Sequence, residues 1–441
     1  MEGEPLNRQR IQTVVRQILA AQPIVDLHTH LYPPGFGTPV PHADGHVDPA
    51  GLMLWGIDEL VTYHYLVAEV FRVVPASVLP YEQFWKMSKS QQADHIWKHL
   101  FVEQTPISEA CRGVLTTLKA LGLDPNETTL SPYRKFFAER EPSGYIDRVM
   151  ELSNVQSITM TNPVFEDNER QRWLKSPAAL ADPRFRAVLR IDPMLRDYRS
   201  AAKKMSEWGF AISPRVDAQS IEEGRRFLRE WIDRQKAVYL AVSLPPEFRY
   251  PADPSNPDAC AGQAMLEKVV LPVCAERGLA FAMMIGSRLR VNPGLRDGGD
   301  MVGKADIESV ANLCRAFAGN RFLVTMLSRE NQHELCVAAR KFGNLTIFGC
   351  WWFLNNPSLI DEIERMRFEL LGTSFIPQHS DARVLDQLVY KWEHARRIIG
   401  NVLTDKYCDL VDTGWRLGRR HVERDVRRLL EGNVERALTS I

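Results

Sequence analysis

The stretch Ile24-Val25-Asp26-Leu27-His28-Thr29-His30-Leu31-Tyr32-Pro33-Pro34 decides how the rest of the chain is interpreted. It predicts a short apolar strand at 24–28 that ends at two histidines, one residue apart. Because residues i and i+2 of a strand share a face, His28 and His30 project together from the strand end. Two neighbouring imidazoles suit Zn, Mn, Fe or Ni, so the stretch indicates a metal site. The alternative is two unrelated polar residues at a strand end.

Further apolar runs alternate with segments long enough for helices along the chain. The runs lie at 157–161, 187–191, 238–243, 280–285, 322–327, 345–349 and 374–377. Strands that alternate with helices pair in parallel, and about eight such units close into a barrel. We therefore predict an α/β fold, a distorted (β/α)8 TIM barrel.

Three regions follow from this pattern. Residues 1–51 contain an N-terminal helix and the first barrel strand with its two histidines. Residues 52–150 have helical spacing of apolar residues and almost no strand signal, so we expect a helical insertion after the first strand. Residues 151–441 complete the barrel and add C-terminal helices. His42 and His46 are interpreted as exposed loop histidines, with a lid over the metal as the alternative.

Composition excludes several classes of protein. The 441 residues carry 55 basic and 55 acidic side chains, and this balance does not predict nucleic-acid binding. We find no apolar run of signal-peptide or membrane-spanning length, so no membrane association is expected. The seven cysteines are scattered without a Cys-x-x-Cys pair, which favours reduced thiols in a cytoplasmic protein. Whether the chain forms a homo-oligomer stays open.

A third metal ligand is expected at the end of the last predicted strand, where the sequence reads Phe375-Ile-Pro-Gln-His-Ser-Asp381. Active sites of barrels lie at the C-terminal ends of the strands, and the first and eighth strands are neighbours. Asp381 can therefore join His28 and His30 in a site for one divalent ion, with Zn expected and Mn as the alternative. The other interpretation of Asp381 is a helix N-cap.

At this point the chain resembles the uronate isomerase branch of the amidohydrolase superfamily. The His-x-His-Leu-x-Pro-Pro and Asp-x-Arg motifs of that branch are matched by residues 28–34 and by Asp381-Ala-Arg383. Its His-Tyr pair and its Trp-Trp-Phe segment are similar to His64-Tyr65 and to Trp351-Trp352-Phe353. Arginines on the third strand and beyond the sixth are similar to Arg190 and Arg329. The resemblance runs from about residue 20 to the C-terminus.

The resemblance implies metal-dependent isomerisation of a hexuronate, such as a glucuronate-like or galacturonate-like sugar acid, between its aldose and ketose forms. Such chemistry passes through an enediol and needs a base, an acid and a group that stabilises the oxyanion. The implied catalytic residues are Asp381, Tyr65 and His64, with Asp381 or Tyr65 as the base. Arg190, Arg329, Arg383, Trp351 and Trp352 are the implied substrate-binding residues, because planar Arg forks suit a carboxylate. Structural ion pairs and core packing are the alternatives for these arginines and tryptophans, and core packing is the alternative for His64-Tyr65.

Two positions depart from the pattern. Met283-Met284 occupies the strand-five position where uronate isomerases usually show histidine, and strand four ends in Val242-Ser243-Leu244 without a histidine. These departures argue against a binuclear hydrolase. A mononuclear amidohydrolase-type hydrolase or decarboxylase stays open, as does an inactive barrel that binds a sugar acid. His394 is interpreted as a helix-surface histidine and is left outside the site.

Overall fold

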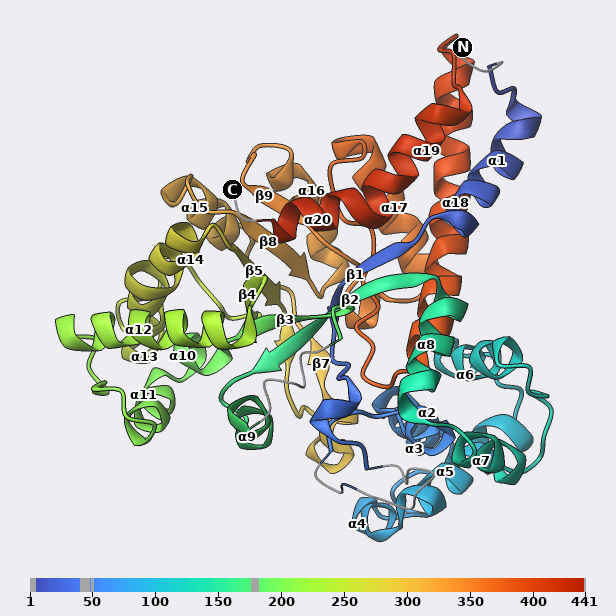
Figure 1. Cartoon of the computed structure of the whole chain (residues 1–441), viewed down its shortest axis with the longest axis horizontal. Coiled ribbons are helices and arrows are strands. Elements are labelled where there is room, and N and C mark those ends of the chain that lie inside the picture. The colour runs from blue at the N-terminus through green and yellow to red at the C-terminus, as the bar shows by residue number, and fades with distance from the viewer. Residues whose placement is uncertain (1–4, 40–47, 49–50, 176–181, 440–441) are drawn as a thin grey trace.

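The computed structural model describes residues 5–39, 48, 51–175 and 182–439 (Figure 1). His42 and His46 lie outside the described residues. Seven parallel strands form one sheet in chain order, which confirms the predicted α/β fold and its TIM-barrel-like architecture. The strands are β1 (Ile24–Thr29), β2 (Val155–Pro163), β3 (Phe185–Arg190), β4 (Tyr239–Leu244), β5 (Ala280–Ile285), β8 (Phe322–Met326) and β9 (Leu345–Ile347).

The eighth barrel position differs from the prediction. The expected strand at 374–377 is reduced to one bridge, between Phe348 and Ile376. On the other side, His30 N donates to Ala382 O at 2.7 Å and Asp381 N donates to His28 O at 3.0 Å. Residues 374–382 thus lie between β9 and β1 as an irregular segment, which we call the closure segment. One physical reason is Pro377, which has no N–H to donate to a strand ladder.

Amphipathic helices cover the outside of the sheet. In α12, the residues that recur at helical spacing, including Phe227, Leu228, Trp231 and Ile232, are buried, and most of its polar residues are at least partly exposed. Gly224 in this helix lies so close to Met265 that a Cβ would come within 3.1 Å of the Met265 methyl carbon. The helices of this layer are α9 (Asp167–Lys175), α10 (Asp192–Arg196), α11 (Tyr198–Glu207), α12 (Ala218–Gln235), α13 (Pro257–Met265), α14 (Leu271–Arg277), α15 (Ile307–Ala316), α16 (Gln332–Ala339) and α17 (Pro357–Leu371).

The region after β1 is helical, as predicted, and lies at one side of the sheet (Figure 1). Its helices are α2 (Ile57–Val61), α3 (His64–Val73), α4 (Tyr81–Lys86), α5 (Lys89–Trp97), α6 (Glu109–Ala120), α7 (Ser131–Ala138) and α8 (Pro142–Ser153). The long helix α18 (Gln387–Asp412) contacts α1 (Arg8–Ala21), α6, α8 and α17. It therefore joins the helical region to the barrel. No helix in the described part of the chain is long and apolar enough to cross a membrane.

The interior of the barrel is a packed core. Side chains from β1, β3, β4, β5 and β8 meet there, among them Leu27, Val188 and Ala282. Val434 and Leu438 of α20 (Asn433–Leu438) belong to the same cluster, and this helix follows α19 (Arg419–Arg427) near the end of the chain. The side chains that could react therefore lie at the other end, where the strands terminate at their carboxyl ends.

A fully buried arginine supports the closure segment from outside. Arg367 on α17 and its partner Glu364 are both 0% exposed, with 3.0 Å between Nη1 and Oε1. The Arg367 guanidinium also donates to Gly349 O at 2.7 Å and to Pro377 O at 3.2 Å. Burial raises the pKa of Glu364 to about 7. Arg367 therefore supplies donors to carbonyls at the edge where the regular ladder ends.

We expect Arg367→Met to lower the free energy of unfolding by about 3 to 5 kcal/mol, because it leaves Glu364 and two carbonyls buried without their donor. Urea denaturation followed by circular dichroism measures this. The matched control is Arg365→Met, two residues away on α17, whose guanidinium pairs with Asp361 and Asp405 at the surface. It should cost about 1 kcal/mol or less. Equal losses in the two variants would contradict the role given to Arg367.

Candidate metal centre and its cavity

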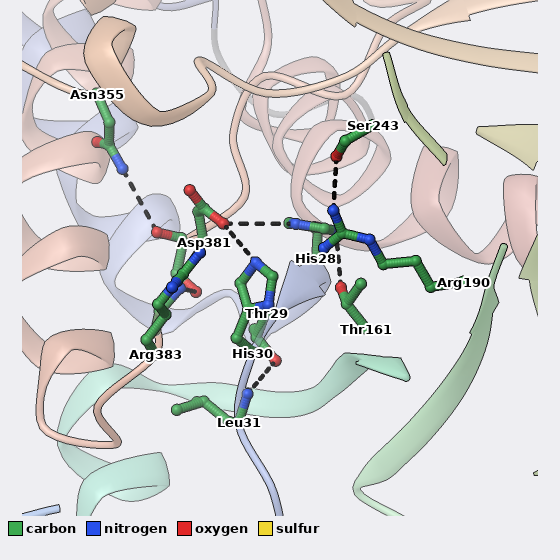
Figure 2. A network of polar contacts seen from close by, with 12 residues as sticks. His28, Thr29, His30, Leu31, Thr161, Arg190, Ser243, Asn355, Asp381 and Arg383 are labelled. Atoms are coloured by element: carbon green, nitrogen blue, oxygen red, sulfur yellow. Dashed lines mark hydrogen bonds and ion pairs between the residues drawn. The ribbon is translucent and has the colours of Figure 1, made fainter. Parts of the chain in front are cut away.

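Two histidines and an aspartate converge at the end of β1 (Figure 2). Asp381 Oδ1 lies 3.4 Å from His28 Nε2 and 3.3 Å from His30 Nε2. One donor atom from each of the three side chains lies within 4.8 Å of the others. The structure thus brings together the three residues that the sequence predicted as ligands.

The surroundings of these three side chains suit a divalent cation. His28 Nε2 is buried without a hydrogen-bond partner, and its Nδ1 lies 3.1 Å from Thr161 Oγ1. This contact suits a tautomer with the proton on Nδ1, which leaves the Nε2 lone pair free for a metal. Burial lowers the pKa of His30 to about 3, so its ring is neutral near pH 7. Burial alone would raise the pKa of Asp381, but its contacts with His28 and His30 hold it well below its usual value.

The backbone of Asp381 is unusual. Its φ is 50°, in the left-handed region that residues other than glycine seldom adopt. The preceding residue is fixed by Asp26, which is fully buried and accepts hydrogen bonds from Ser380 N at 3.1 Å and from Trp392 Nε1 at 2.8 Å. Strained backbone of this kind persists where surrounding contacts over-determine it, which is common at functional sites.

A cavity of about 90 Å³ opens beside the three side chains. It is lined by His28, His30, His64, Arg190, Arg196, Ser243, Met284, Ser287, Leu289, Asp300, Trp351, Trp352, Asp381 and Arg383. Ligand pockets usually measure about 300–1,000 Å³, so this cavity is small by comparison. The lining combines metal-ligand candidates, arginines and tryptophans.

The three predicted arginines have different surroundings. Arg190, at the end of β3, forms a bidentate pair with Asp192 at 2.7 and 2.9 Å and donates to Ser243 Oγ at 2.9 Å. Arg383 lines the cavity and is 3.5 Å from Asp297. Arg329 pairs with Glu362 at 3.0 Å and does not line the cavity; its side chain is 57% exposed. Two of the three predicted arginines are thus brought to the cavity.

His64 and Tyr65 begin α3, but only His64 lines the cavity. Burial lowers the pKa of His64 well below its usual value, so its ring is neutral. The Tyr65 hydroxyl is buried without a hydrogen-bond partner in the described structure, and burial raises its pKa. Trp351 and Trp352 line the cavity and are also mostly buried. They therefore form part of the cavity wall and also pack in the protein interior.

Sequence reasoning missed several of the lining residues. Ser243 lines the cavity, and Thr161 contacts His28 Nδ1; both lie near the ends of apolar strands. A polar residue near the carboxyl end of an apolar strand is the sequence signal that could have identified them. Leu289 and Asp300 come from the connection around the short hairpin β6 (Ser287–Arg288) and β7 (Met301–Val302), which no apolar periodicity marked. His379 is fully buried with its ring centroid 5.2 Å from that of His28.

The expectation for His394 was wrong. Its ring is 4% exposed and lies between α18 and α6, with Nδ1 2.6 Å from Glu109 Oε1 and Nε2 2.9 Å from Thr116 Oγ1. The ring is buried because the helical region supplies polar partners that the local sequence does not reveal. His394 does not line the cavity.

Comparison with known proteins places the chain among solved sugar-acid isomerases. It is 48% identical to a uronate isomerase from Bacillus halodurans C-125, with a TM-score of 0.91, covering 98% of this chain and 97% of that one. A uronate isomerase from Thermotoga maritima has 16% identity and a TM-score of 0.74, covering 99% and 98% of the two chains. A glucuronate isomerase from Caulobacter crescentus has 15% identity and a TM-score of 0.73, covering 98% and 94%. The last two similarities show the fold alone. No family model and no curated protein matches the chain.

We expect His28→Ala to lose most bound divalent metal while the fold persists, because one of three donor groups disappears. Elemental analysis of the purified protein measures the metal, and circular dichroism measures the fold. His333→Ala, which changes an exposed histidine on α16, is the matched control and should keep wild-type metal content. Full metal occupancy in His28→Ala would contradict the assignment of His28 as a metal ligand.

Proposed function

The chain belongs to the uronate isomerase family, and we propose that it interconverts the aldose and ketose forms of a hexuronate. The observation that carries the proposal is the convergence of His28, His30 and Asp381 beside a cavity that arginines also line. Two imidazoles and a carboxylate suit one divalent ion, and arginines in the lining suit a sugar acid. A glucuronate-like or galacturonate-like substrate fits this chemistry.

We propose Zn as the ion, with Mn as the alternative, because nitrogen and oxygen donors suit both. His28 Nε2, His30 Nε2 and an Asp381 oxygen would hold it. When bound, such an ion polarises a carbonyl and orients neighbouring oxygens. Thr161 then keeps the His28 ring in place through Nδ1.

Asp381 is the proposed base. Its low pKa keeps it ionised, and its side chain lines the cavity. In the forward direction it removes the proton from C2 of the open-chain aldose, while O1 gains a proton, which gives the enediol. The same carboxyl group then returns the proton to C1 as O2 loses its hydroxyl proton, which gives the ketose. Tyr65, the alternative base, has less support because its hydroxyl is buried with a raised pKa and it does not line the cavity.

The remaining roles concern the substrate's oxygens and carboxylate. His64 lines the cavity as a neutral ring and can donate a hydrogen bond to a substrate oxygen. Arg383 is the better-supported partner for the carboxylate, because the Arg190 fork is already occupied by Asp192. Trp351 and Trp352 would form the apolar wall. The cavity gives no support for Arg329.

The proposal extends to organisation and location. The helical region, taken as residues 52–150, supplies His64, and the barrel, taken as residues 1–51 and 151–441, supplies the other proposed site residues that line the cavity. A cytoplasmic location is supported by the seven cysteines, all of which are free and six of which are buried. The proposed partner is a small sugar acid.

The reaction is tested by incubating the enzyme with hexuronates in heavy water. Isomerisation should introduce solvent deuterium at C1 or C2, because the base exchanges its proton with solvent while the enediol persists. Asp381→Asn, assayed at saturating metal with its metal content measured, should abolish both exchange and turnover. Tyr65→Phe is the comparison variant and should retain exchange. Release of a second product without exchange at carbon would replace the isomerase proposal with a hydrolytic one.

Arg383→Lys should raise the KM for a uronate by about tenfold or more, because lysine keeps the charge but loses the planar fork. Steady-state kinetics with each single variant measure this. Arg190→Lys should have a smaller effect, since Asp192 already occupies its fork. The control is Arg420→Lys, at an exposed position on α19. A change in KM with Arg329→Lys and none with Arg383→Lys would contradict Arg383 as the carboxylate partner and favour Arg329, another of the three arginines predicted from the sequence.

A further inference from the structure

A buried lysine lies behind the proposed ligand Asp381. Lys391 on α18 is 3% exposed. Its Nζ donates to Ser380 O at 2.6 Å and to Asp381 O at 3.2 Å. An ammonium group is costly to bury unless its hydrogen bonds are satisfied, and here backbone carbonyls satisfy them. The side chain therefore spans from α18 to two consecutive peptide groups of the closure segment.

These two peptide groups set the direction of the Asp381 side chain. Asp381 has a φ of 50°, and its N–H donates to His28 O at 3.0 Å. This hydrogen bond fixes the nitrogen side of the residue, and the Lys391 ammonium fixes the carbonyl side. Lys391 Nζ is the hydrogen-bond donor to the Asp381 carbonyl within the described part of the chain, so without the ammonium this peptide group could rotate toward the more populated right-handed region. That rotation would move the carboxylate away from the two histidines.

The neighbouring residue is held in the same way. Ser380 N donates to the buried carboxylate of Asp26, and Ser380 O accepts from Lys391. Trp392, next to Lys391 on α18, donates to the same Asp26 carboxylate at 2.8 Å. Consecutive residues of one helix thus contact the closure segment and the strand that bears the histidines, so α18 sets the distance between the two halves of the centre.

We propose that Lys391 is a positioning residue, which holds the Ser380 and Asp381 carbonyls so that the Asp381 carboxylate stays directed at His28 and His30. This inference rests on the proposed metal site. Lys391 does not line the cavity, so it acts through the backbone of Asp381. Loss of a group that orients a metal ligand typically lowers metal affinity by about 10–100-fold.

The test is the metal affinity of the full chain with Lys391→Met, which removes the donors and keeps an unbranched side chain. Metal is removed with a chelator and restored by titration with Zn²⁺ in a competition assay, or with Co²⁺, whose visible spectrum reports the ligand geometry. We expect affinity to fall by about 10–100-fold and the Co²⁺ spectrum to change. At saturating metal, kcat should fall more than KM rises, because Asp381 also acts as the proposed base.

Two control variants on α18 separate positioning from stability. Lys406→Met removes a lysine that pairs with Glu369 at 2.7 Å on the surface. Tyr407→Phe removes a buried hydrogen bond to Asp425 of 3.1 Å, so it should lower the melting temperature. Neither should alter metal affinity or the Co²⁺ spectrum. Lys391→Arg restores cationic donors at the same place and should recover part of the lost affinity.

Wild-type metal affinity and spectrum in folded Lys391→Met would overturn the proposal. If Lys391→Met is insoluble, Lys391→Gln takes its place, because its amide is neutral and its side chain is shorter than that of lysine. Unchanged affinity there would overturn the proposal equally. If the wild-type protein binds no divalent ion, both the proposed metal site and the proposed role of Lys391 are wrong. If the wild-type protein binds metal but does not isomerise uronates, only the proposed reaction is wrong, because the metal titration needs no substrate.

Discussion

The closure of the sheet is the constraint on which the rest of the structure depends. Between β9 and β1 the chain does not form a regular strand, yet residues 374–382 are almost all enclosed, and buried backbone groups need hydrogen-bond partners. Side chains supply them. Arg367 on α17 bonds to Gly349 O and Pro377 O, Lys391 on α18 bonds to Ser380 O and Asp381 O, and Asp26 on β1 accepts from Ser380 N.

The irregular backbone of the closure segment also positions the Asp381 carboxylate. Adjacent strands of a regular barrel direct alternate side chains to the interior, at positions that the pleat determines. Asp381 has a left-handed φ instead of the extended backbone of a pleated strand. Its Oδ1 lies at nearly equal distances from His28 Nε2 and His30 Nε2, 3.4 and 3.3 Å. A regular eighth strand would satisfy its backbone with less help from the helices, but it would hold Asp381 at a different angle. The unusual backbone and the proposed role therefore coincide in one residue.

Sequence alone could predict the elements that depend on local periodicity. Alternation in β1 places His28 and His30 on one face, and barrel closure brings Asp381 to them. It could not choose between His64 and Tyr65, because adjacent helical residues point about 100° apart and only the packing of α3 decides which faces the cavity. Arg329 follows β8 as a strand-end arginine should, but Glu362 on α17 pairs with it at the surface. Such long-range partners leave no mark in local sequence.

The position of the proposed base also limits the chemistry. In an aldose–ketose conversion the proton moves between adjacent carbons, so one carboxylate with two oxygens can serve both ends without leaving its place. This requires a carboxylate that is ionised when it takes up the proton and that does not rotate away, which fits Asp381, whose carboxylate is buried and whose backbone is bonded on both sides. Met284 on β5 and Ser243 on β4 occupy positions near strand ends where side chains that donate to a metal could otherwise lie. Among the described residues one group of three therefore remains that could hold a metal, and the proposed base of the reaction belongs to that group.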